Sequence, residues 1–316
     1  MNTMLAQPIS KMLTLSPPIF TSSDRPDQKN QNPKRSLCKK MLLMISCLSL
    51  LGITHAAAGE TLRWAVYYSN KTPLNTLMQY QLLIFDNETH PPITPLIEKN
   101  KTVLGYLSLG EVGQHRAYYN QLKRDGLLLQ ENKNWTGSYA IDIRDKRWTS
   151  LVIEELLPSI LQQGFHGIFI DTLDIPPHQE RTAPKRFRGM TDAAIQLLKT
   201  IRYHYPSIKI MLNRGYDILP QVAPLIDYAL GESVYTTYNF TTKSYEPVNN
   251  SLYSQQVGIL QSAKKVAPHL VVMTLDYWQP NDVQGIANIY AQQRANGFVP
   301  YVGTIKLDII VPEPNL

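Results

Sequence analysis

Short apolar runs that end in acidic or other polar residues recur along the chain. The clearest, GFHGIFIDTLD at residues 164–174, is apolar on consecutive positions and then turns to Asp171 and Asp174. Consecutive apolar residues are typical of a strand buried on both faces, and carboxylates at its end must reach solvent because their burial is costly. The same pattern predicts eight strands, at residues 64–69, 82–87, 102–111, 166–174, 209–215, 228–233, 270–278 and 297–308.

Stretches with helical periodicity separate many of these strands, at residues 148–163, 191–203, 254–267 and 283–295. Alternation of strand and helix favours parallel pairing, because each crossover between parallel strands needs a helix. Eight such strands predict a (β/α)8 TIM barrel of class α/β, with its chemistry at the carboxyl ends of the strands.

Two connections are longer than the others, at residues 113–147 and 175–189. Long loops at the carboxyl ends of barrel strands usually shape a substrate cleft. The second loop carries four basic residues, Arg181, Lys185, Arg186 and Arg188. A solvated loop is the plainer interpretation of this basic set.

The amino-terminal segment has the pattern of a secretory signal. Lys39 and Lys40 precede an apolar run at residues 41–53, and three alanines ending at Ala58 follow it. We therefore divide the chain into 1–40, a disordered or wrongly started extension with a basic flank; 41–58, the signal and its cleavage site; and 59–316, the barrel. An uncleaved membrane anchor and lipidation at Cys47 remain alternatives.

Cleavage after Ala58 leaves 258 of the 316 residues, which fits a single barrel domain of roughly 250 residues. It also removes most of the net charge of +6, since residues 1–58 hold seven of the 31 Lys and Arg and two of the 25 Asp and Glu. The remaining 24 basic and 23 acidic residues give no electrostatic footprint for nucleic acid. Both cysteines, Cys38 and Cys47, lie in the part removed. We expect an exported monomer, secreted or periplasmic, with no membrane contact after cleavage.

Acidic residues lie at or near the ends of many predicted strands, and aromatic residues accompany them. The acids are Asp86, Glu111, Asp171, Asp174, Glu232 and Asp276; the aromatics are Tyr67, Tyr68, Tyr106, Tyr235, Tyr238, Tyr277 and Trp278. This combination suits a sugar, whose C–H faces stack on rings while its hydroxyls bond to carboxylates. Two carboxylates that flank a glycosidic bond can hydrolyse it.

Several of these acids have a structural alternative. Asp86 and Asp276 could bond only to backbone amides at strand ends, and Glu111 could be a turn residue. Asn213 could be structural, and Arg214 could orient the acids rather than take part in chemistry. Other chemistries find no motif: the sequence has no HExxH pair, P-loop, GxGxxG after a strand or GxSxG elbow, so we expect neither a metal nor a cofactor.

Three motifs in order, YLSLGE at 106–111, GFHGIFIDTLD at 164–174 and LGES at 230–233, resemble the endo-alpha-1,4-polygalactosaminidase family, glycoside hydrolase family 114. The resemblance covers residues 64–308. It implies an exported TIM-barrel endo-glycosidase acting on a polysaccharide that contains galactosamine or N-acetylgalactosamine. It also implies that Asp171 is the nucleophile or stabilising carboxylate and Glu232 the proton donor. The resemblance favours retention of configuration, but the outcome depends on the separation of the two carboxylates, so inversion stays open.

We add a predicted set of substrate-binding residues around this pair: Tyr68, Asp86, Glu111, Asp174, Asn213, Arg214, Tyr235, Asp276 and Tyr277. We also expect burial and the neighbouring Asp171 to raise the pKa of Glu232. The basic loop would repel a cationic, deacetylated polymer if it lined the cleft. A carbohydrate-binding pseudoenzyme and a transglycosylase are the alternative functions.

Overall fold

The computed structural model describes residues 62–314. The predicted extension at 1–40 and the predicted signal at 41–58, with Cys47 and the cleavage site, lie outside the described residues. No described helix has both the length and the apolar character needed to cross a membrane.

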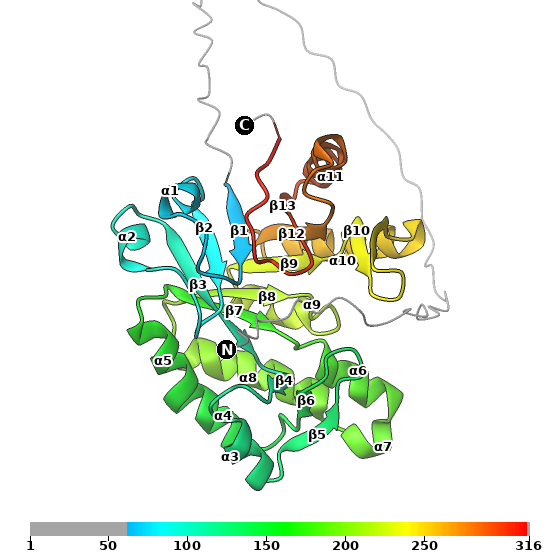
Figure 1. The fold of residues 1–316 in the computed structure, drawn as a ribbon. Coiled ribbons are helices and arrows are strands. Elements are labelled where there is room, and N and C mark those ends of the chain that lie inside the picture. The colour runs from blue at the N-terminus through cyan, green and yellow to red at the C-terminus, as the bar shows by residue number, and fades with distance from the viewer. Residues whose placement is uncertain (1–61, 315–316) are drawn as a thin grey trace, which may run out of the picture. The chain divides into compact units, whose positions relative to one another are not determined.

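Eight parallel strands form the central sheet, in the spatial order β1-β2-β3-β7-β8-β9-β12-β13 (Figure 1). All eight predicted strands are present, each shorter than predicted at one or both ends. Their bounds are β1 Trp64–Tyr67, β2 Leu82–Phe85, β3 Thr102–Ser108, β7 Gly167–Asp171, β8 Lys209–Asn213, β9 Tyr228–Glu232, β12 Val271–Tyr277 and β13 Val299–Gly303.

The first and last strands of this order lie side by side. The indole Nε1 of Trp64 on β1 donates a hydrogen bond to the carbonyl of Val299 on β13 at 3.0 Å, and its ring lies 5.6 Å from that of Tyr301. The sheet is thus a nearly closed (β/α)8 barrel, as predicted. Its strands are apolar and buried along most of their length, as strands covered on both faces must be.

Helices follow most strands and surround the sheet (Figure 1). Three of the predicted helices appear as single elements and are the longest of the described residues: α8 Met190–His204, α10 Asn250–Val266 and α11 Val283–Ala295. The shorter ones are α1 Leu74–Leu77, α2 Thr94–Ile97, α3 Tyr119–Arg124, α4 Lys146–Leu151, α5 Leu157–Gln162, α6 Ile175–Thr182, α7 Pro184–Phe187, α9 Leu219–Val222 and the 3₁₀ turn η2 Ala223–Leu225.

The predicted helix at 148–163 is divided by a π-helical turn, η1 Val152–Leu156, between α4 and α5. Pro158 stands at the start of α5. Proline has no N–H to donate to the carbonyl four residues earlier, and a wider turn before it avoids the clash of its ring with that carbonyl.

Both long connections, and the chain after β9, contain regular structure that the sequence pattern did not predict. The second long connection, residues 175–189, forms α6 and α7. Residues 111–141 form a three-stranded antiparallel sheet, and a hairpin follows β9 (Figure 1). These strands are β4 Glu111–Gly113, β5 Leu128–Glu131 and β6 Ser138–Ile141 in the sheet, and β10 Thr236–Asn239 and β11 Ser244–Pro247 in the hairpin. The prediction of one strand over 102–111 is therefore wrong, because β3 ends at Ser108 and the chain turns before Glu111 starts β4.

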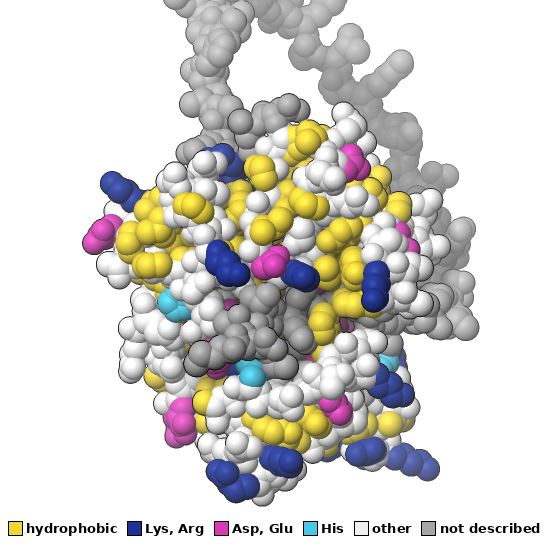
Figure 2. All heavy atoms as spheres, in the orientation of Figure 1, with side chains coloured by type: hydrophobic (Ala, Val, Ile, Leu, Met, Phe, Trp, Pro, Cys, Tyr) yellow, Lys and Arg dark blue, Asp and Glu magenta, His cyan; other side chains and the backbone are white. Residues whose placement is uncertain are grey.

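Charged side chains of both signs are interspersed on the upper part of the face drawn in Figure 2. This agrees with the near balance of acidic and basic residues in the barrel sequence. Buried carboxylates, by contrast, gather at the carboxyl ends of the barrel strands, where Asp171 and Glu232 are the last residues of β7 and β9.

Candidate active site

Asp171 and Glu232 end two strands that are separated in the barrel only by β8. The two side chains are 3% and 2% exposed. Asn213 is the last residue of β8 and lies between them. The sequence predicted each of these residues at a strand end, and the parallel sheet brings all three to the same rim.

The amide nitrogen of Asn213 joins the two carboxylates. Its Nδ2 donates to Oδ1 of Asp171 at 3.0 Å and to Oε2 of Glu232 at 2.6 Å. Since both oxygens are bonded to one nitrogen, their separation is at most the sum of these distances, about 5.6 Å. The pair is therefore close enough to act on a single bond.

Two tyrosine hydroxyls bind the carboxylate oxygens of Asp171 and Glu232 that Asn213 does not bind. The hydroxyl of Tyr106 on β3 donates to Oδ2 of Asp171 at 2.9 Å, and that of Tyr277 on β12 donates to Oε1 of Glu232 at 2.6 Å. The backbone N–H of Thr172 also donates to Oδ1 of Asp171, at 2.9 Å. Asp171 thus receives three hydrogen bonds and Glu232 two, which favours the ionised form more strongly at Asp171.

Burial raises the pKa of both carboxyls, as predicted for Glu232. The pKa of Asp171 is raised to about 6, mainly by burial, against the opposing effect of its hydrogen bonds from Asn213 and Tyr106. Burial, with the added repulsion of Asp171, raises the pKa of Glu232 to about 7. Burial thus favours retention of a proton by the pair, and the repulsion from Asp171 together with fewer hydrogen bonds makes Glu232 its preferred carrier.

The residue after each of these three side chains has a left-handed backbone. Thr172, Arg214 and Ser233 have φ values of 67°, 54° and 55°. A positive φ is unfavourable for residues other than glycine, most of all for a β-branched one such as Thr172. Such turns, repeated on three consecutive barrel strands, end each strand abruptly and fix the direction of its last side chain.

Thr172 offsets this cost with a set of hydrogen bonds from the neighbouring strand. Its Oγ1 accepts from the N–H groups of Gly110 and Glu111 at 2.7 and 3.1 Å, and donates to the carbonyl of Asp171 at 2.6 Å. A Cβ on Gly110 would lie 2.1 Å from the carbonyl oxygen of Thr172, so only glycine fits. This contact joins the start of β4 to the end of β7.

Glu111 is held beside the pair by the same contact. It is 5% exposed, and its oxygens accept from Asn132 Nδ2 and Ser138 Oγ, both at 2.9 Å. Burial raises its pKa to about 7, with Asp171 and Asp174 adding repulsion. Glu111 is therefore a third buried carboxyl of the rim, oriented by the three-stranded sheet.

Asp86 forms an ion pair with Arg116. Its Oδ2 lies 2.7 Å from Nη2 of Arg116, and its Oδ1 accepts from the N–H groups of Glu88 and Thr89. The guanidinium of Arg116 also lies 5.8 Å from the ring centre of Tyr106. Asp86 thus holds Arg116 near the ring of Tyr106.

Asp276 bonds to backbone amides, which was the structural alternative given for it in the sequence analysis. It is completely buried, and its Oδ1 accepts from the N–H groups of Tyr235 and Thr236 while its Oδ2 accepts from Gln293. Burial raises its pKa to about 6. It anchors the chain after β9 to β12, and substrate contact by Asp276 remains a prediction.

Asp174 and Arg214 lie next to the pair, on the turns after β7 and β8. The Nε of Arg214 is 3.9 Å from Oδ2 of Asp174, beyond hydrogen-bonding distance. The positive charge of Arg214 lowers the pKa of Glu232 without a direct ion pair between the two.

Two further predicted residues are aromatic. Tyr68 is 3% exposed, its ring lies 5.6 Å from that of Tyr106, and burial with the charges of Asp171 and Glu232 raises its pKa well above the ordinary value. Tyr235 is half-buried and packs against Tyr253, 5.3 Å between ring centres. Tyr68 therefore lies with the catalytic candidates, whereas Tyr235 lies at the hairpin.

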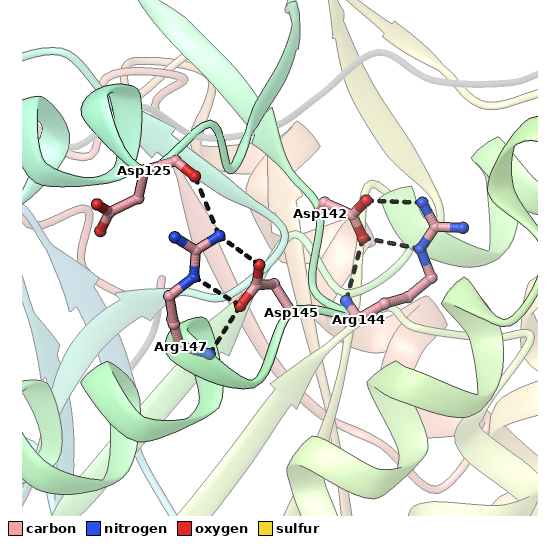
Figure 3. A network of polar contacts seen from close by, with 5 residues as sticks. All are labelled: Asp125, Asp142, Arg144, Asp145 and Arg147. Atoms are coloured by element: carbon pink, nitrogen blue, oxygen red, sulfur yellow. Dashed lines mark hydrogen bonds and ion pairs between the residues drawn. The ribbon is translucent and has the colours of Figure 1, made fainter.

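A polar network of aspartates and arginines joins the segment after β6 to its neighbours (Figure 3). Asp145 accepts from the N–H of Arg147 and so caps α4, while Asp142 pairs with Arg144, 2.6 Å from Oδ2 to Nη2. Nη1 of Arg144 donates to the carbonyls of Arg186 and Arg188. These two bonds tie the end of α7 to the segment after β6.

The basic side chains after Asp174 are exposed, and Arg181 pairs with Asp217 at 2.9 Å. This agrees with the solvated-loop interpretation.

Sequence reasoning missed Arg116 and Thr172 as supports of the site. Thr172 could have been found, since it follows the acid of the clearest motif, but no local pattern connects Arg116 to Asp86. Within residues 62–314, no group of three or more His, Cys, Asp or Glu side chains could hold a metal ion.

Comparison with known protein families identifies the family of the chain. The sequence model of glycoside hydrolase family GH114 matches residues 53–315. The chain belongs to family GH114. It is therefore a glycoside hydrolase, and the motifs around Asp171 and Glu232 lie inside the matched region.

The chain also resembles other proteins in sequence and in fold. The GH114 chain is 23% identical over 219 residues to an uncharacterized protein of Deinococcus radiodurans, covering 67% of each chain, and 20% identical over 235 residues to one of Thermotoga maritima, covering 68% of each. The glycoside hydrolase domain of PelA from Pseudomonas aeruginosa has the same fold, with a TM-score of 0.71, 24% identity and coverage of 80% of this chain and 98% of that one. Ega3 of Aspergillus fumigatus, solved in complex with galactosamine, has a TM-score of 0.59, 14% identity and coverage of 79% and 94%.

Proposed function

We propose that this GH114 hydrolase is an exported endo-glycosidase that cleaves an alpha-1,4-linked galactosamine or N-acetylgalactosamine polymer. The observation that carries the proposal is the single Asn213 amide bonded to both Asp171 and Glu232. It keeps two carboxyls of different pKa within reach of one glycosidic bond. The galactosamine bound to Ega3 supports the choice of sugar, and the signal pattern ending near Ala58 supports export.

In the proposed reaction Glu232 protonates the glycosidic oxygen, and the leaving sugar departs with that proton. Asp171 attacks the anomeric carbon and forms a covalent glycosyl-enzyme. Glu232, now ionised, takes a proton from water, whose oxygen attacks the same carbon and releases Asp171. Facing oxygens at most about 5.6 Å apart support this retaining route, since retention uses carboxyls about 5 to 5.5 Å apart and inversion roughly 6.5 to 9.5 Å.

A panel of amino-sugar polymers, read out by the reducing ends released, tests the proposal. We expect internal cleavage of the galactosamine-type polymers, and none of a beta-linked glucosamine polymer. Binding without release over long incubation would instead identify a carbohydrate-binding protein, and products longer than the substrate a transferase. The amino-terminal residue of the exported protein, read by mass spectrometry, tests cleavage after Ala58; an intact residue 41–58 segment would contradict it.

The rate should depend on pH as a narrow bell. The productive form has Asp171 ionised and Glu232 protonated, so kcat/KM should rise as pH passes the lower pKa, about 6, and fall as pH passes the upper one, about 7. A profile of kcat/KM measured from about pH 4 to pH 9 checks this. A flat profile across the neutral range would contradict the assignment.

Two conservative variants test which carboxyl titrates on the acid side and which on the basic side of the pH profile. Tyr277→Phe removes a hydrogen bond that lowers the pKa of Glu232, so the basic limb should move to higher pH. Tyr106→Phe removes one that lowers the pKa of Asp171, so the acid limb should move upward instead. If either variant moved the opposite limb, the roles of the two acids would be exchanged.

A further inference from the structure

The peptide group between Asp171 and Thr172 is held at both of its ends. Its carbonyl accepts hydrogen bonds from the N–H of Leu109 at 3.0 Å and from the hydroxyl of Thr172 at 2.6 Å. Its N–H donates to Oδ1 of Asp171 at 2.9 Å. Because a peptide group is planar and rigid, the bonds that fix its carbonyl also fix the direction of its N–H.

The hydroxyl of Thr172 fastens this peptide to the chain after β3. Its Oγ1 accepts from the N–H groups of Gly110 and Glu111, at 2.7 and 3.1 Å. Oγ of Ser108 lies 2.8 Å from the same oxygen. With Leu109, which bonds the carbonyl of the peptide, three consecutive backbone donors converge on the end of β7.

The N–H of Thr172 differs from the corresponding groups on the next two strands. The N–H of Arg214, after β8, donates to the carbonyl of Leu230 on β9 at 2.8 Å. That of Ser233, after β9, donates to the carbonyl of Leu275 on β12, also at 2.8 Å. Those two groups continue the bonding between neighbouring strands, whereas the N–H of Thr172 is directed to the carboxylate of the preceding residue. Such a bond favours the ionised form of a carboxyl.

The left-handed backbone of Thr172 indicates what its side chain is for. With a φ of 67°, the position suits glycine and is unfavourable for a β-branched residue. Glycine, however, has no hydroxyl to bind Gly110, Glu111 and the carbonyl of Asp171. Threonine is thus explained by its hydrogen bonds and not by the turn that it occupies.

We propose that Thr172 is a positioning residue for Asp171. Its hydroxyl holds the peptide in the orientation that directs the N–H to Oδ1, and so keeps the carboxylate ionised and pointed in one direction. Thr172 itself need not touch the sugar. This deepens the proposed function, in which Asp171 is the nucleophile, and rests on it.

Substitutions at Thr172 leave in place the other groups that act on Asp171. The charged ones are Glu232 on β9, Glu111 on β4, and Asp174 and Arg214 on the turns after β7 and β8; the tyrosines are Tyr68, Tyr106 and Tyr277. Glu111 also bonds to Thr172 through its N–H, but its carboxylate is held separately by Asn132 and Ser138. A change in the titration of Asp171 therefore reports the bond from the Thr172 N–H.

Three substitutions at Thr172 separate the hydroxyl from the shape of the side chain. Thr172→Val keeps the shape but offers no acceptor, Thr172→Gly removes both the hydroxyl and the strain at positive φ, and Thr172→Ser keeps the hydroxyl. In Thr172→Val and Thr172→Gly, the acid side of the kcat/KM profile should move to higher pH by about one pH unit. Thr172→Ser should match the wild type.

A carbon NMR titration of the Asp171 carboxyl gives a readout that needs no turnover. The protein carries aspartate labelled with carbon-13 at the carboxyl and the substitution Glu232→Gln, so that the coupled acid does not titrate. The signal of Asp171 is the one lost on adding Asp171→Asn. The pKa of Asp171 should be higher in Thr172→Val and Thr172→Gly than in Thr172→Ser or the unsubstituted background, by about one pH unit.

Thr274→Val is the matched control. Thr274 on β12 is also a completely buried threonine, but its Oγ1 has no hydrogen-bond partner among the described residues. Its replacement by the isosteric valine should leave the pH profile and the titration of Asp171 unchanged.

Two outcomes would overturn the inference. One is a lower melting temperature in Thr172→Val with an unchanged titration of Asp171, which would mean a purely structural threonine. The other is an equal shift in Thr172→Ser, since the hydroxyl would then not be the cause. If Asp171→Asn keeps its turnover while the titration shifts as expected, the proposed function fails and the action of Thr172 on Asp171 stands. Thermal unfolding establishes that each variant is folded, and Thr172→Gly decides the comparison if Thr172→Val is not.

Discussion

Replacing Asp171 by Asn or Glu232 by Gln should abolish turnover on the preferred polymer while the barrel stays folded. Each change keeps the size of the side chain and removes its ability to attack carbon or to donate a proton. Loss of a nucleophile or general acid lowers rates by about a thousandfold or more. The measurement is kcat from reducing ends released, with thermal unfolding recorded for the same preparations.

The folded state should tolerate both changes, because each carboxyl is nearly fully buried and its raised pKa means that burial disfavours its ionised form. A neutral amide of the same shape avoids that cost. Asp217→Asn is a suitable control, since Asp217 is an exposed acid of the same rim paired with Arg181, and it should retain normal turnover. Near-normal rates in both Asp171→Asn and Glu232→Gln would remove the two-carboxylate assignment.

Gly167→Ala should be the most destabilising single methyl addition in the barrel. Gly167 begins β7 and pairs with Lys209 on β8. A Cβ at Gly167 would lie 1.9 Å from the carbonyl oxygen of Lys209 and 2.6 Å from its nitrogen. Both obstructing atoms are backbone held in the strand ladder, so relief requires the two strands to separate.

We expect this substitution to lower the free energy of unfolding by about 3 kcal/mol or more. For a domain of this size that corresponds to a melting temperature lower by about 6 °C or more, measured by thermal unfolding. Gly258→Ala is the control, because Gly258 lies inside α10 with no atom within 4 Å of an added Cβ. It should raise stability by up to about 1 kcal/mol. Equal effects of the two substitutions would refute the steric argument.

The barrel could be predicted from sequence because its strands are buried on both faces and so appear as continuous apolar runs. The strand at 166–174 illustrates this, since its run ends at the residue that the structure places on the rim. The small sheet after β3 could not be predicted, because β5 and β6 are short, partly exposed and mixed in polarity. β6 also pairs with β4, where Glu111 lies opposite Ala140, and no local pattern encodes a pairing between segments so far apart in the chain.

In the candidate site, too, some residues could be predicted from the sequence and others could not. Asp171, Asn213 and Glu232 could be nominated because each ends a strand, and the parallel sheet then made them neighbours. Asp276 ends no strand but satisfied the same pattern, and it is engaged with backbone amides instead. The choice between an acid that faces substrate and one that anchors a loop depends on hydrogen bonds between residues about 40 positions apart, and sequence pattern carries no record of these.

The buried carboxyls also link the stability of the fold to acidity. Asp171 and Asp276 have pKa values near 6, and Glu111 and Glu232 near 7, against ordinary values of 3.8 and 4.5. Between these limits the native barrel retains protons that the unfolded chain would release. Their contribution to stability is therefore complete in mild acid, below the ordinary values, and is lost as pH rises through 6 and 7. The pH at which these four carboxyls favour the folded state most lies below the pH at which Asp171, the proposed nucleophile, ionises, so part of their contribution to stability is lost at the proposed working pH.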